Sequence, residues 1–587
     1  MSSSQEGQTW RVIVEHIDDI RSRINASCVH IESWQVASYT LSFVFLVLYI
    51  IELASSDRAV GDRIRSRIFH LLRTLPWVQR RLNEDLARAK KEIEEEVHQY
   101  DQTREFYKFI PERGLSREEI KTEAIHYHEL GNKRRRIVTN EQGDEEKRKI
   151  KLVSEVASLF GNTNPRDSNT FPGSRKMESE LVRMSLSLFH GGSDGLGIVV
   201  PSTAEATVMA LSAARNASIR QGITNPCVVA SSSASPSLFH AAKLLRMRVT
   251  VVQSKKDGSV EAGSIKRAIS SDTAIIFVSA PNYSTGTMDP IDTIAKIAQR
   301  YHIYLHVDCS LGGFILPFLE LCDYHIPSFD FRLPGVSSIS IDFSRYSHCP
   351  SSIALTLFRD QQMMKGSIFS LPEWPGGIYS SPSLSDSLDG SAVAAAWSTL
   401  LATGKEGFVE STQKLVEATK KLALLLSEMD GITIIGSADT IIVAFETNRP
   451  HDIYHIIEVM RMKGWPLEPL LSPPAARIMM NIDLAEDDII DSLIEDLDTS
   501  LVQLHNNPHL GESSSIRAFH HLVATAPDRW LVRELASERA LAHYSMPPVT
   551  DNRRTLRTLS VEGRKMSMIT AHTELVERRK NLIDNDK

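Results

Sequence analysis

Residues 304–314 read YLHVDCSLGGF, a short apolar strand that ends in an acid and runs into a glycine-containing turn. Before it, β-branched runs alternate with helical stretches; these runs are GIVV at 197–200, CVVAS at 227–231, VTVV at 249–252 and AIIFVS at 274–279. Such alternation predicts an α/β fold with a parallel sheet covered by helices on both faces. Ligands gather at the carboxyl ends of strands in open sheets of this kind, so Asp308 is a candidate site residue.

The sheet is expected to continue through SSISID at 337–342 and IALTLF at 353–358. After Gly404 the pattern changes to a long helix at 407–429 followed by mixed strands and helices, which predicts a smaller α+β domain. The expected regions are a lumenal N-terminus (1–32), a transmembrane helix (33–53), a stalk and N-terminal segment (54–155), the large domain (156–404), the small domain (405–546) and a polar tail (547–587).

One segment departs from the pattern of a soluble protein. Residues 33–51 contain no charged side chain and match about one bilayer crossing, which predicts a single-pass anchor. Lys and Arg number three in residues 1–34 and ten in residues 54–91, and positive flanks remain cytosolic. The main body is therefore expected in the cytosol, with the Asn25 glycosylation sequon on the lumenal side; the sequence does not show whether Asn25 is modified.

Composition argues against several other functions. A net charge of −7 and a pI near 6.3 give no electrostatic footprint for nucleic-acid binding. The five cysteines are widely spread without a CxxC motif, so they indicate neither a disulfide framework nor a metal site. The sequence also lacks a P-loop and an HExxH motif.

Three further stretches carry a family resemblance: FPGSRKMESELVRMSLSLFHGG at 171–192, Asp330–Ser340, and WPGGIYSSP at 374–382. In order and spacing they resemble the sphingosine-1-phosphate lyase family, over roughly residues 30–546. The resemblance implies a fold-type-I pyridoxal-phosphate (PLP) domain of the group II decarboxylase kind, a dimer and an endoplasmic-reticulum membrane location. It also implies a lyase reaction of sphingolipid metabolism that cleaves long-chain-base phosphates to an aldehyde and phosphoethanolamine.

The same resemblance supplies candidate cofactor positions. It places Asp308 against the pyridine nitrogen, where a carboxylate keeps the ring protonated and electron-withdrawing. The positions that it assigns to cofactor binding, regarded here as vestigial, are Asp308, Ser202, Thr203, Ser235, Ser340 and Gly377.

The family's lysine position is occupied by arginine. The family reads Asp-Thr-His-Lys-Tyr-Gly where this chain reads Asp342-Phe-Ser-Arg345-Tyr-Ser, and that lysine forms the Schiff base with PLP. A Schiff base needs a neutral primary amine, whereas arginine remains protonated above pH 12. A shifted register does not help, because no lysine occurs between Lys296 and Lys365. No catalytic residue is therefore expected.

The phosphate loop is altered as well. The family pattern Thr-Ser-Gly-Gly-Thr-Glu-Ser is matched here by VPSTAEA at 200–206, in which proline removes one N–H and both glycines are gone. Glycine lets a phosphate approach the backbone N–H groups at a helix start, and hydroxyl side chains there donate hydrogen bonds to it. Ser202 and Glu205 also form an S-x-x-E capping box, which is a purely structural interpretation of the same residues.

Other positions of the family motifs differ too. The histidine that stacks on the cofactor aligns with Ser235, a tyrosine with Thr139 and an arginine with Leu388. The segment Asn-Pro-Leu-His-Pro-Asp aligns with NPRDSN at 164–169. Cofactor and substrate positions have thus changed together, whereas the positions that define the fold persist.

We therefore expect a pseudoenzyme with weak or no PLP binding. It would bind a lipid phosphate, form a homodimer, or pair with an active lyase relative. An active sphingosine-1-phosphate lyase is the alternative, and it requires PLP held without a covalent bond. A lysine-independent activity in the same pocket also stays open.

Overall fold

The computed structural model describes residues 73–98, 109–129, 144–438, 440–448, 453–465, 467–507 and 529–545. The expected membrane helix, Asn25, Thr139 and the polar tail lie outside these residues. Within the described ranges, none of the helices combines the length and the apolar character needed to span a bilayer. Residues 73–86 and 529–530 belong to one compact unit, and the remaining described residues belong to a second.

The second unit holds the strands. They are β1 (Leu196–Val200), β2 (Cys227–Ser231), β3 (Arg248–Val252), β4 (Thr273–Ser279), β5 (Tyr304–Asp308), β6 (Ser338–Asp342), β7 (Ala354–Phe358), β8 (Phe369–Leu371), β9 (Tyr379–Ser381), β10 (Ile432–Ile435), β11 (Ile442–Thr447), β12 (Glu468–Leu471) and β13 (Pro474–Met479).

Helices precede, connect and follow these strands. They are α4 (Pro76–Val97), α5 (Arg117–Glu129), α6 (Asp144–Leu159), α7 (Pro172–Leu188), α8 (Thr203–Arg220), α9 (Pro236–Leu244), α10 (Ala262–Ala268), α11 (Ile291–Tyr301), α12 (Leu316–Leu319), the 3₁₀ helix η3 (Glu320–Cys322), α13 (Gln361–Lys365), α14 (Gly390–Glu428), α15 (Ile453–Met462), α16 (Asp487–Asn506) and α18 (Arg529–Ala542).

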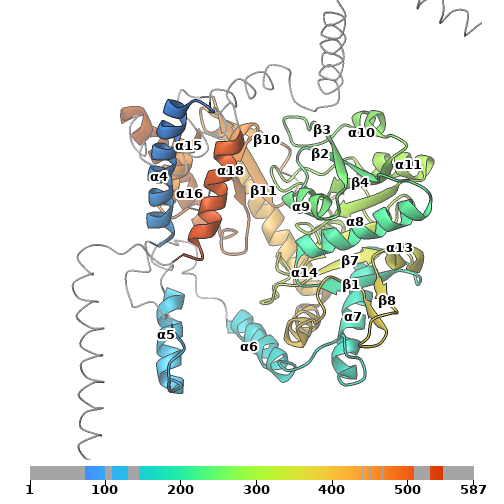
Figure 1. Cartoon of the computed structure of the whole chain (residues 1–587). Coiled ribbons are helices and arrows are strands. Elements are labelled where there is room, and N and C mark those ends of the chain that lie inside the picture. Colours follow the sequence, from blue (N-terminus) through green and yellow to red (C-terminus); the bar gives the residue numbers. More distant parts are fainter. Residues whose placement is uncertain are drawn as a thin grey trace, which may run out of the picture. The chain divides into compact units, whose positions relative to one another are not determined.

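Seven strands form the main sheet, in the order β1-β7-β6-β5-β4-β2-β3 (Figure 1). The five strands from β6 to β3 pair in parallel, as the βα alternation predicts. β7 is antiparallel to both of its neighbours, so the sheet is mixed. A second sheet, of order β10-β11-β13-β12, is antiparallel throughout, and β8 and β9 form a separate hairpin.

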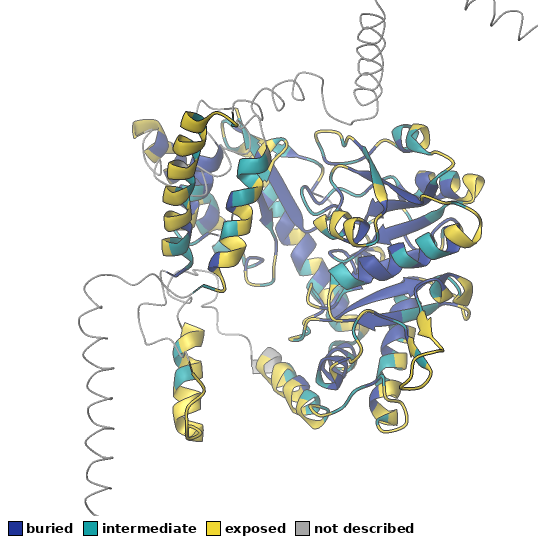
Figure 2. Ribbon diagram, viewed as in Figure 1, coloured by how far each residue is buried: buried dark blue, intermediate teal, exposed yellow. Residues whose placement is uncertain are grey.

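The central strands of the main sheet, β2 and β4 to β7, are buried on both faces, which explains their continuous apolar sequences (Figure 2). Along β1, Ile198 and Val200 contribute to one hydrophobic cluster, whereas Val199 contributes to the other. The first cluster packs under α8 and α9, and the second lies under α7, α11, α12 and α14. This period of two follows from the pleat, because successive side chains of a strand point to opposite faces.

The elements predicted from residue 197 to 358 are confirmed, but the later boundaries differ. The helix expected at 407–429 begins at Gly390, where the Asp389 carboxylate accepts a hydrogen bond from Ser391 N at 2.9 Å. α14 then passes through Gly404, whose φ of 63° and ψ of 176° are not helical. The β8–β9 hairpin was not predicted, because its three-residue strands are largely exposed and carry no buried apolar alternation.

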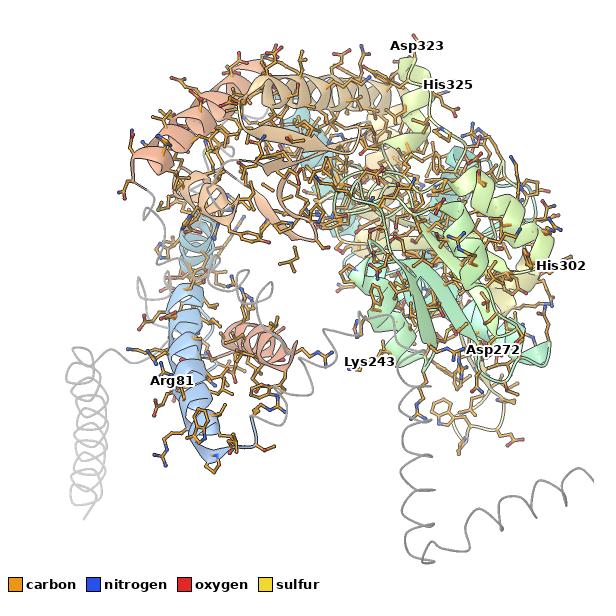
Figure 3. The ribbon with its side chains drawn as sticks, turned by 90° about the horizontal axis from the view of Figure 1, so that it is seen from above. Arg81, Lys243, Asp272, His302, Asp323 and His325 are labelled. Atoms are coloured by element: carbon orange, nitrogen blue, oxygen red, sulfur yellow. The ribbon has the colours of Figure 1, made fainter. Side chains whose placement is uncertain are left out.

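The two edges of the main sheet are distinct. Asp272 immediately precedes β4 and His302 lies two residues before β5, so both mark the amino edge, and both are labelled in Figure 3. Asp308 and Asp342 are the last residues of β5 and β6 and lie at the carboxyl edge. The candidate site is built on this second edge, as expected for an open sheet of mainly parallel strands.

Candidate functional site

Asp308 is the buried acid at the end of β5, with 5% of its surface exposed. Its Oδ1 accepts hydrogen bonds from the backbone N–H of Ser310 and from the hydroxyls of Ser310 and Ser340. Burial raises the pKa of Asp308, the bonds from Ser310 and Ser340 partly offset that rise, and the nearby Asp342 carboxylate adds to it. None of the groups that shift the pKa of Asp308 is a cation, so its charged form is held by hydrogen bonds alone.

His306 lies two residues earlier on the same face of β5 and extends this hydrogen-bond chain. Its Nδ1 is 2.9 Å from Ser338 Oγ, and its Nε2 is 3.2 Å from Ser340 Oγ. Because the Ser340 proton is donated to Asp308, Nε2 donates to Ser340 and Nδ1 accepts from Ser338. Burial lowers the pKa of His306 to about 3, so the imidazole is neutral. No role was predicted for His306, although its i, i+2 spacing from Asp308 was an available signal.

Asp342, at the end of β6, accepts a 2.7 Å hydrogen bond from the Thr203 hydroxyl at the start of α8. Its other oxygen accepts from the backbone N–H and the hydroxyl of Ser344. Thr203, predicted at a phosphate position, thus donates its only hydroxyl proton to an acid of its own chain. This contact joins the helix start to the turn that carries Arg345.

Arg345 lies on the exposed turn after β6, and its backbone N–H contacts Asp342 O at 3.4 Å. Within the described part of the chain, no hydrogen bond or ion pair of its guanidinium is seen. The next residue, Tyr346, has a φ of 60° and donates its hydroxyl to Met480 O at 2.8 Å. The turn therefore holds its tyrosine against the residue that follows β13 and leaves the arginine on the surface.

Lys365 does not reach this edge. Asp342 pairs with Ala354 and Ser338 pairs with Phe358, so β7 starts at the carboxyl edge and ends at the amino edge. Lys365 follows in α13, beyond that far end. A five-residue strand spans roughly 17 Å at about 3.3 Å per residue, which separates Lys365 from the turn after β6.

The start of α8 departs from the predicted capping box. Ser202 Oγ accepts from Glu205 N at 3.3 Å, so the predicted cap is confirmed. The Glu205 carboxylate does not return to Ser202, as a full box requires. It accepts instead from Leu384 N at 3.0 Å, from Ser385 N at 3.2 Å and from the Ser385 hydroxyl at 3.0 Å. Glu205 therefore binds a segment that is distant in sequence.

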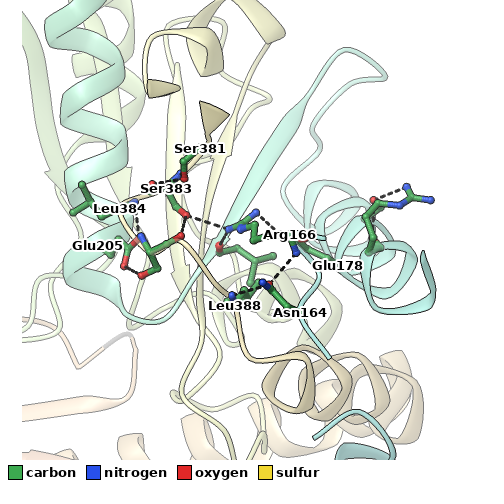
Figure 4. A network of polar contacts seen from close by, with 12 residues as sticks. Asn164, Arg166, Glu178, Glu205, Ser381, Ser383, Leu384 and Leu388 are labelled. Carbon is green, nitrogen blue, oxygen red and sulfur yellow. Dashed lines mark hydrogen bonds and ion pairs between the residues drawn. The ribbon is translucent and has the colours of Figure 1, made fainter. Parts of the chain in front are cut away.

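That segment, residues 381–389, is held at several points, and we call it the 381–389 segment (Figure 4). Arg166 donates to Glu178 at 2.9 Å, to Val199 O at 2.7 Å and to Ser383 Oγ at 3.3 Å. Asn164 Oδ1 accepts from Leu388 N at 3.1 Å. Residues 164–169 were predicted only as changed family positions, and an arginine there that joins β1, α7 and this segment was not expected.

A pocket of about 250 Å³ lies beside the segment. Its lining is Pro201, Ser351, Ser352, Ile353, Leu388, Asp389 and Ala392. Pro201 and Leu388 thus face the same cavity. The family resemblance assigns them to two separate motifs. Leu388 is 4% exposed, and Asp389 is the one ionisable residue in the lining.

The remaining predicted positions are more dispersed. Ser340 contacts Asp308, as described above. Ser235 begins α9, where its hydroxyl accepts from Ser237 N, so it serves as a helix cap. Gly377 lies between β8 and β9 with a φ of 118°, outside the main sheet. Among the described residues no cluster of three or more His, Cys, Asp or Glu side chains is arranged to hold a metal ion.

This chain is similar to known proteins in its domain, its sequence and its structure. Residues 149–448 match the family model described as "Pyridoxal-dependent decarboxylase conserved domain". Lactobacillus brevis glutamate decarboxylase aligns with a TM-score of 0.58 at 19% identity, over 70% of this chain and 97% of that chain. That likeness reflects the shared fold.

The more similar relatives carry one name. Sphingosine-1-phosphate lyase 1 of Rattus norvegicus is 30% identical over 537 residues, which cover 90% of this chain and 93% of the relative. The Dictyostelium discoideum sphingosine-1-phosphate lyase is 31% identical over 83% of this chain and 91% of its own. The Burkholderia pseudomallei lyase structure aligns with a TM-score of 0.65 at 29% identity, over 72% of this chain and 98% of that one. With its mixed α/β sheet and the acid at the end of β5, this chain belongs to the sphingosine-1-phosphate lyase family of pyridoxal-dependent decarboxylase domains.

Proposed function

We propose that this chain is a catalytically inactive member of its family and acts by binding. The observation that carries the proposal is Arg345 on the turn after β6, where the family resemblance places the lysine. PLP is the cofactor of the family, and a lysine amine would hold it as a Schiff base. A guanidinium that stays protonated provides no such nucleophile. Lys365 is at the opposite edge of the sheet.

The other groups at this edge support the same proposal. Thr203 donates to Asp342, while Ser202 and Ser235 cap their own helices. Pro201 offers no N–H group to a phosphate. Asp308 remains suited to a protonated ring nitrogen, but the residues as a set do not fit PLP held through a Schiff base. We therefore derive no reaction step that involves PLP.

An absorbance spectrum of the purified full-length chain tests the proposal. After incubation with excess PLP and removal of the free cofactor, we expect no aldimine band that borohydride abolishes. In parallel, a long-chain-base phosphate should yield no aldehyde above the level of a heat-treated sample. The rat lyase, handled identically, serves as the positive control. A borohydride-sensitive band together with aldehyde release would establish the active lyase instead.

We further propose that the chain forms a dimer, with itself or with an active relative, through the β8–β9 hairpin. Phe369, Trp374 and Ile378 of this hairpin are 57%, 51% and 88% exposed. Large apolar side chains gathered on one surface element are typical of protein interfaces. Burying them on a partner would remove this apolar area from water.

Light scattering on the detergent-solubilised full chain measures this assembly. Ile378→Asp is expected to shift the mass toward the monomer, whereas Leu424→Asp, at a 59% exposed position of α14, should leave it unchanged. Co-expression with a tagged rat lyase distinguishes the mixed dimer. A monomer in both experiments would contradict the proposal.

A further inference from the structure

We infer that the pocket beside the 381–389 segment binds a ligand that carries an ammonium group and an aliphatic chain without a phosphate. The inference rests on the proposed binding function and narrows its ligand class. Four of the seven lining residues, Pro201, Ile353, Leu388 and Ala392, are apolar, and the other three are two serines and Asp389. A cavity of about 250 Å³ is large enough for a small polar head group and the first carbons of a chain.

The charge of the lining decides between an anion and a cation. Asp389 is exposed and is the sole charged residue among the seven that line the cavity. An anionic head group would lack a cationic partner and would be repelled by this carboxylate, whereas an ammonium group would be attracted. Ser351 and Ser352 can both donate and accept, which suits hydroxyl groups on the same ligand.

The geometry of this acid is fixed before any ligand arrives. Asp389 is the N-cap of α14 and accepts from Ser391 N at 2.9 Å and from the Ser391 hydroxyl at 2.8 Å. The segment that carries it is held by Glu205 through Leu384 and Ser385, and by Asn164 through Leu388 N. A pre-formed wall lowers the ordering cost of binding. The apolar Leu388 beside this acid would contact the aliphatic part of the ligand.

Calorimetry on the full-length chain in detergent tests the inference with three water-soluble probes. They are an eight-carbon 2-amino-1,3-diol, its 1-phosphate and the corresponding diol without the amine. The amine is expected to bind more tightly than either of the others, by about tenfold, because a hydrogen bond to a charged group contributes that much.

Two variants locate the binding. Asp389→Asn keeps a good helix cap, since Asn and Asp are equivalent there, but removes the charge. It should weaken the amine about tenfold and leave the diol unchanged. Leu388→Arg should raise the affinity for the phosphate ester, with circular dichroism used to check that this buried substitution folds. Ser391→Ala, which removes a partner of Asp389 but no charge, is the matched control and should retain the preference for the amine.

The inference is overturned if the phosphate ester binds as tightly as the amine, if Asp389→Asn leaves amine binding unchanged, or if no probe binds. These outcomes can be distinguished from a result that refutes the proposed inactivity. Aldehyde release from the phosphate ester would refute inactivity, whereas absent amine binding with no turnover would refute only the ligand class.

Discussion

Arg345 is the single side chain on which the proposal of inactivity rests. Lysine and arginine are both cationic at neutral pH, but only the lysine amine can lose its proton readily and attack a carbonyl. Arg345 also projects from an exposed turn, where burial does not disfavour its charge. An arginine at this position is therefore compatible with the fold, and under the proposal it leaves the turn without a nucleophilic amine.

Arg345→Lys alone is not expected to restore lyase activity. The phosphate loop has also changed, at Pro201, Ala204 and Ala206, and loss of two donors to a charged group costs about 3–6 kcal/mol. That corresponds to about 10²–10⁴ in cofactor affinity. The measurement is aldehyde release at saturating PLP with a long-chain-base phosphate, with Arg345→Met as the variant that lacks an amine. Turnover near that of the rat lyase would mean that Arg345 is the only defect.

His306 should make the free energy of unfolding depend on pH. Its folded-state pKa of about 3 lies below the ordinary value near 6.5, so the unfolded chain binds the proton first as pH falls. The contribution of His306 to the free energy of unfolding is therefore fully present above about pH 6.5. It is lost as the pH falls toward 3, by up to about 1.4 kcal/mol per pH unit.

Urea unfolding at several pH values between about 4.5 and 6.5 measures this slope. His306→Gln retains a donor and an acceptor for Ser338 and Ser340 but does not titrate there. The slope of its unfolding free energy against pH should be smaller than that of the parent, by the amount that corresponds to nearly one proton. Burial raises the pKa of Asp289 to about 6. Asp289 contributes the same pH dependence to both proteins, so its contribution cancels from the difference between their slopes. Identical slopes would show that His306 is not held neutral.

At the scale of elements, the 381–389 segment is positioned by residues of β1, α7, α8 and the loop before α7. The ion pair between Arg166 and Glu178 is central to it, with side chains only 16% and 13% exposed. Burial raises the pKa of Glu178, and the charge of Arg166 opposes that rise. Removing one partner would leave the other charge buried and unpaired.

Arg166→Met is accordingly expected to destabilise the protein by about 3–5 kcal/mol, and Arg166→Met with Glu178→Gln by clearly less. A double-mutant cycle from urea unfolding gives the coupling energy. Lys151 and Glu155, 4.0 Å apart and 78% and 65% exposed, form the matched control pair, which should couple by less than about 1 kcal/mol. Equal coupling in the two pairs would contradict a buried, structural role for Arg166.

At the scale of the whole molecule, we propose that residues 33–51 form a single-pass anchor with the body in the cytosol, and the family resemblance implies the endoplasmic-reticulum membrane. Protease added to intact microsomes should digest the chain from about residue 60 onward and spare a short N-terminal fragment. Detergent-opened microsomes are the control, in which the fragment should also disappear. Protection of the body from the protease would indicate the opposite orientation. Release of the chain from the membrane by carbonate would argue against an anchor.

Much of the fold could be predicted because local patterns carry it. The β-branched runs before Asp308 gave strands β1 to β5, since apolar period and length distinguish buried strands from the helices between them. The Ser202 cap was predictable for the same reason, as its partner Glu205 N is three residues away. The β8–β9 hairpin and the start of α14 were missed, because exposed short strands and a helix continuing through Gly404 have weak local signals.

The sequence by itself determined the α/β fold, the acid at the end of β5 and an arginine at position 345, where the family resemblance places a lysine. These depend on residue identity and on period along the chain. Only the tertiary structure decided that Glu205 binds residues 384–385, that Arg166 pairs with Glu178, and that Pro201 and Leu388 line the same pocket. Such contacts join positions far apart in sequence, and they form because packing brings buried polar groups to partners that local patterns do not specify.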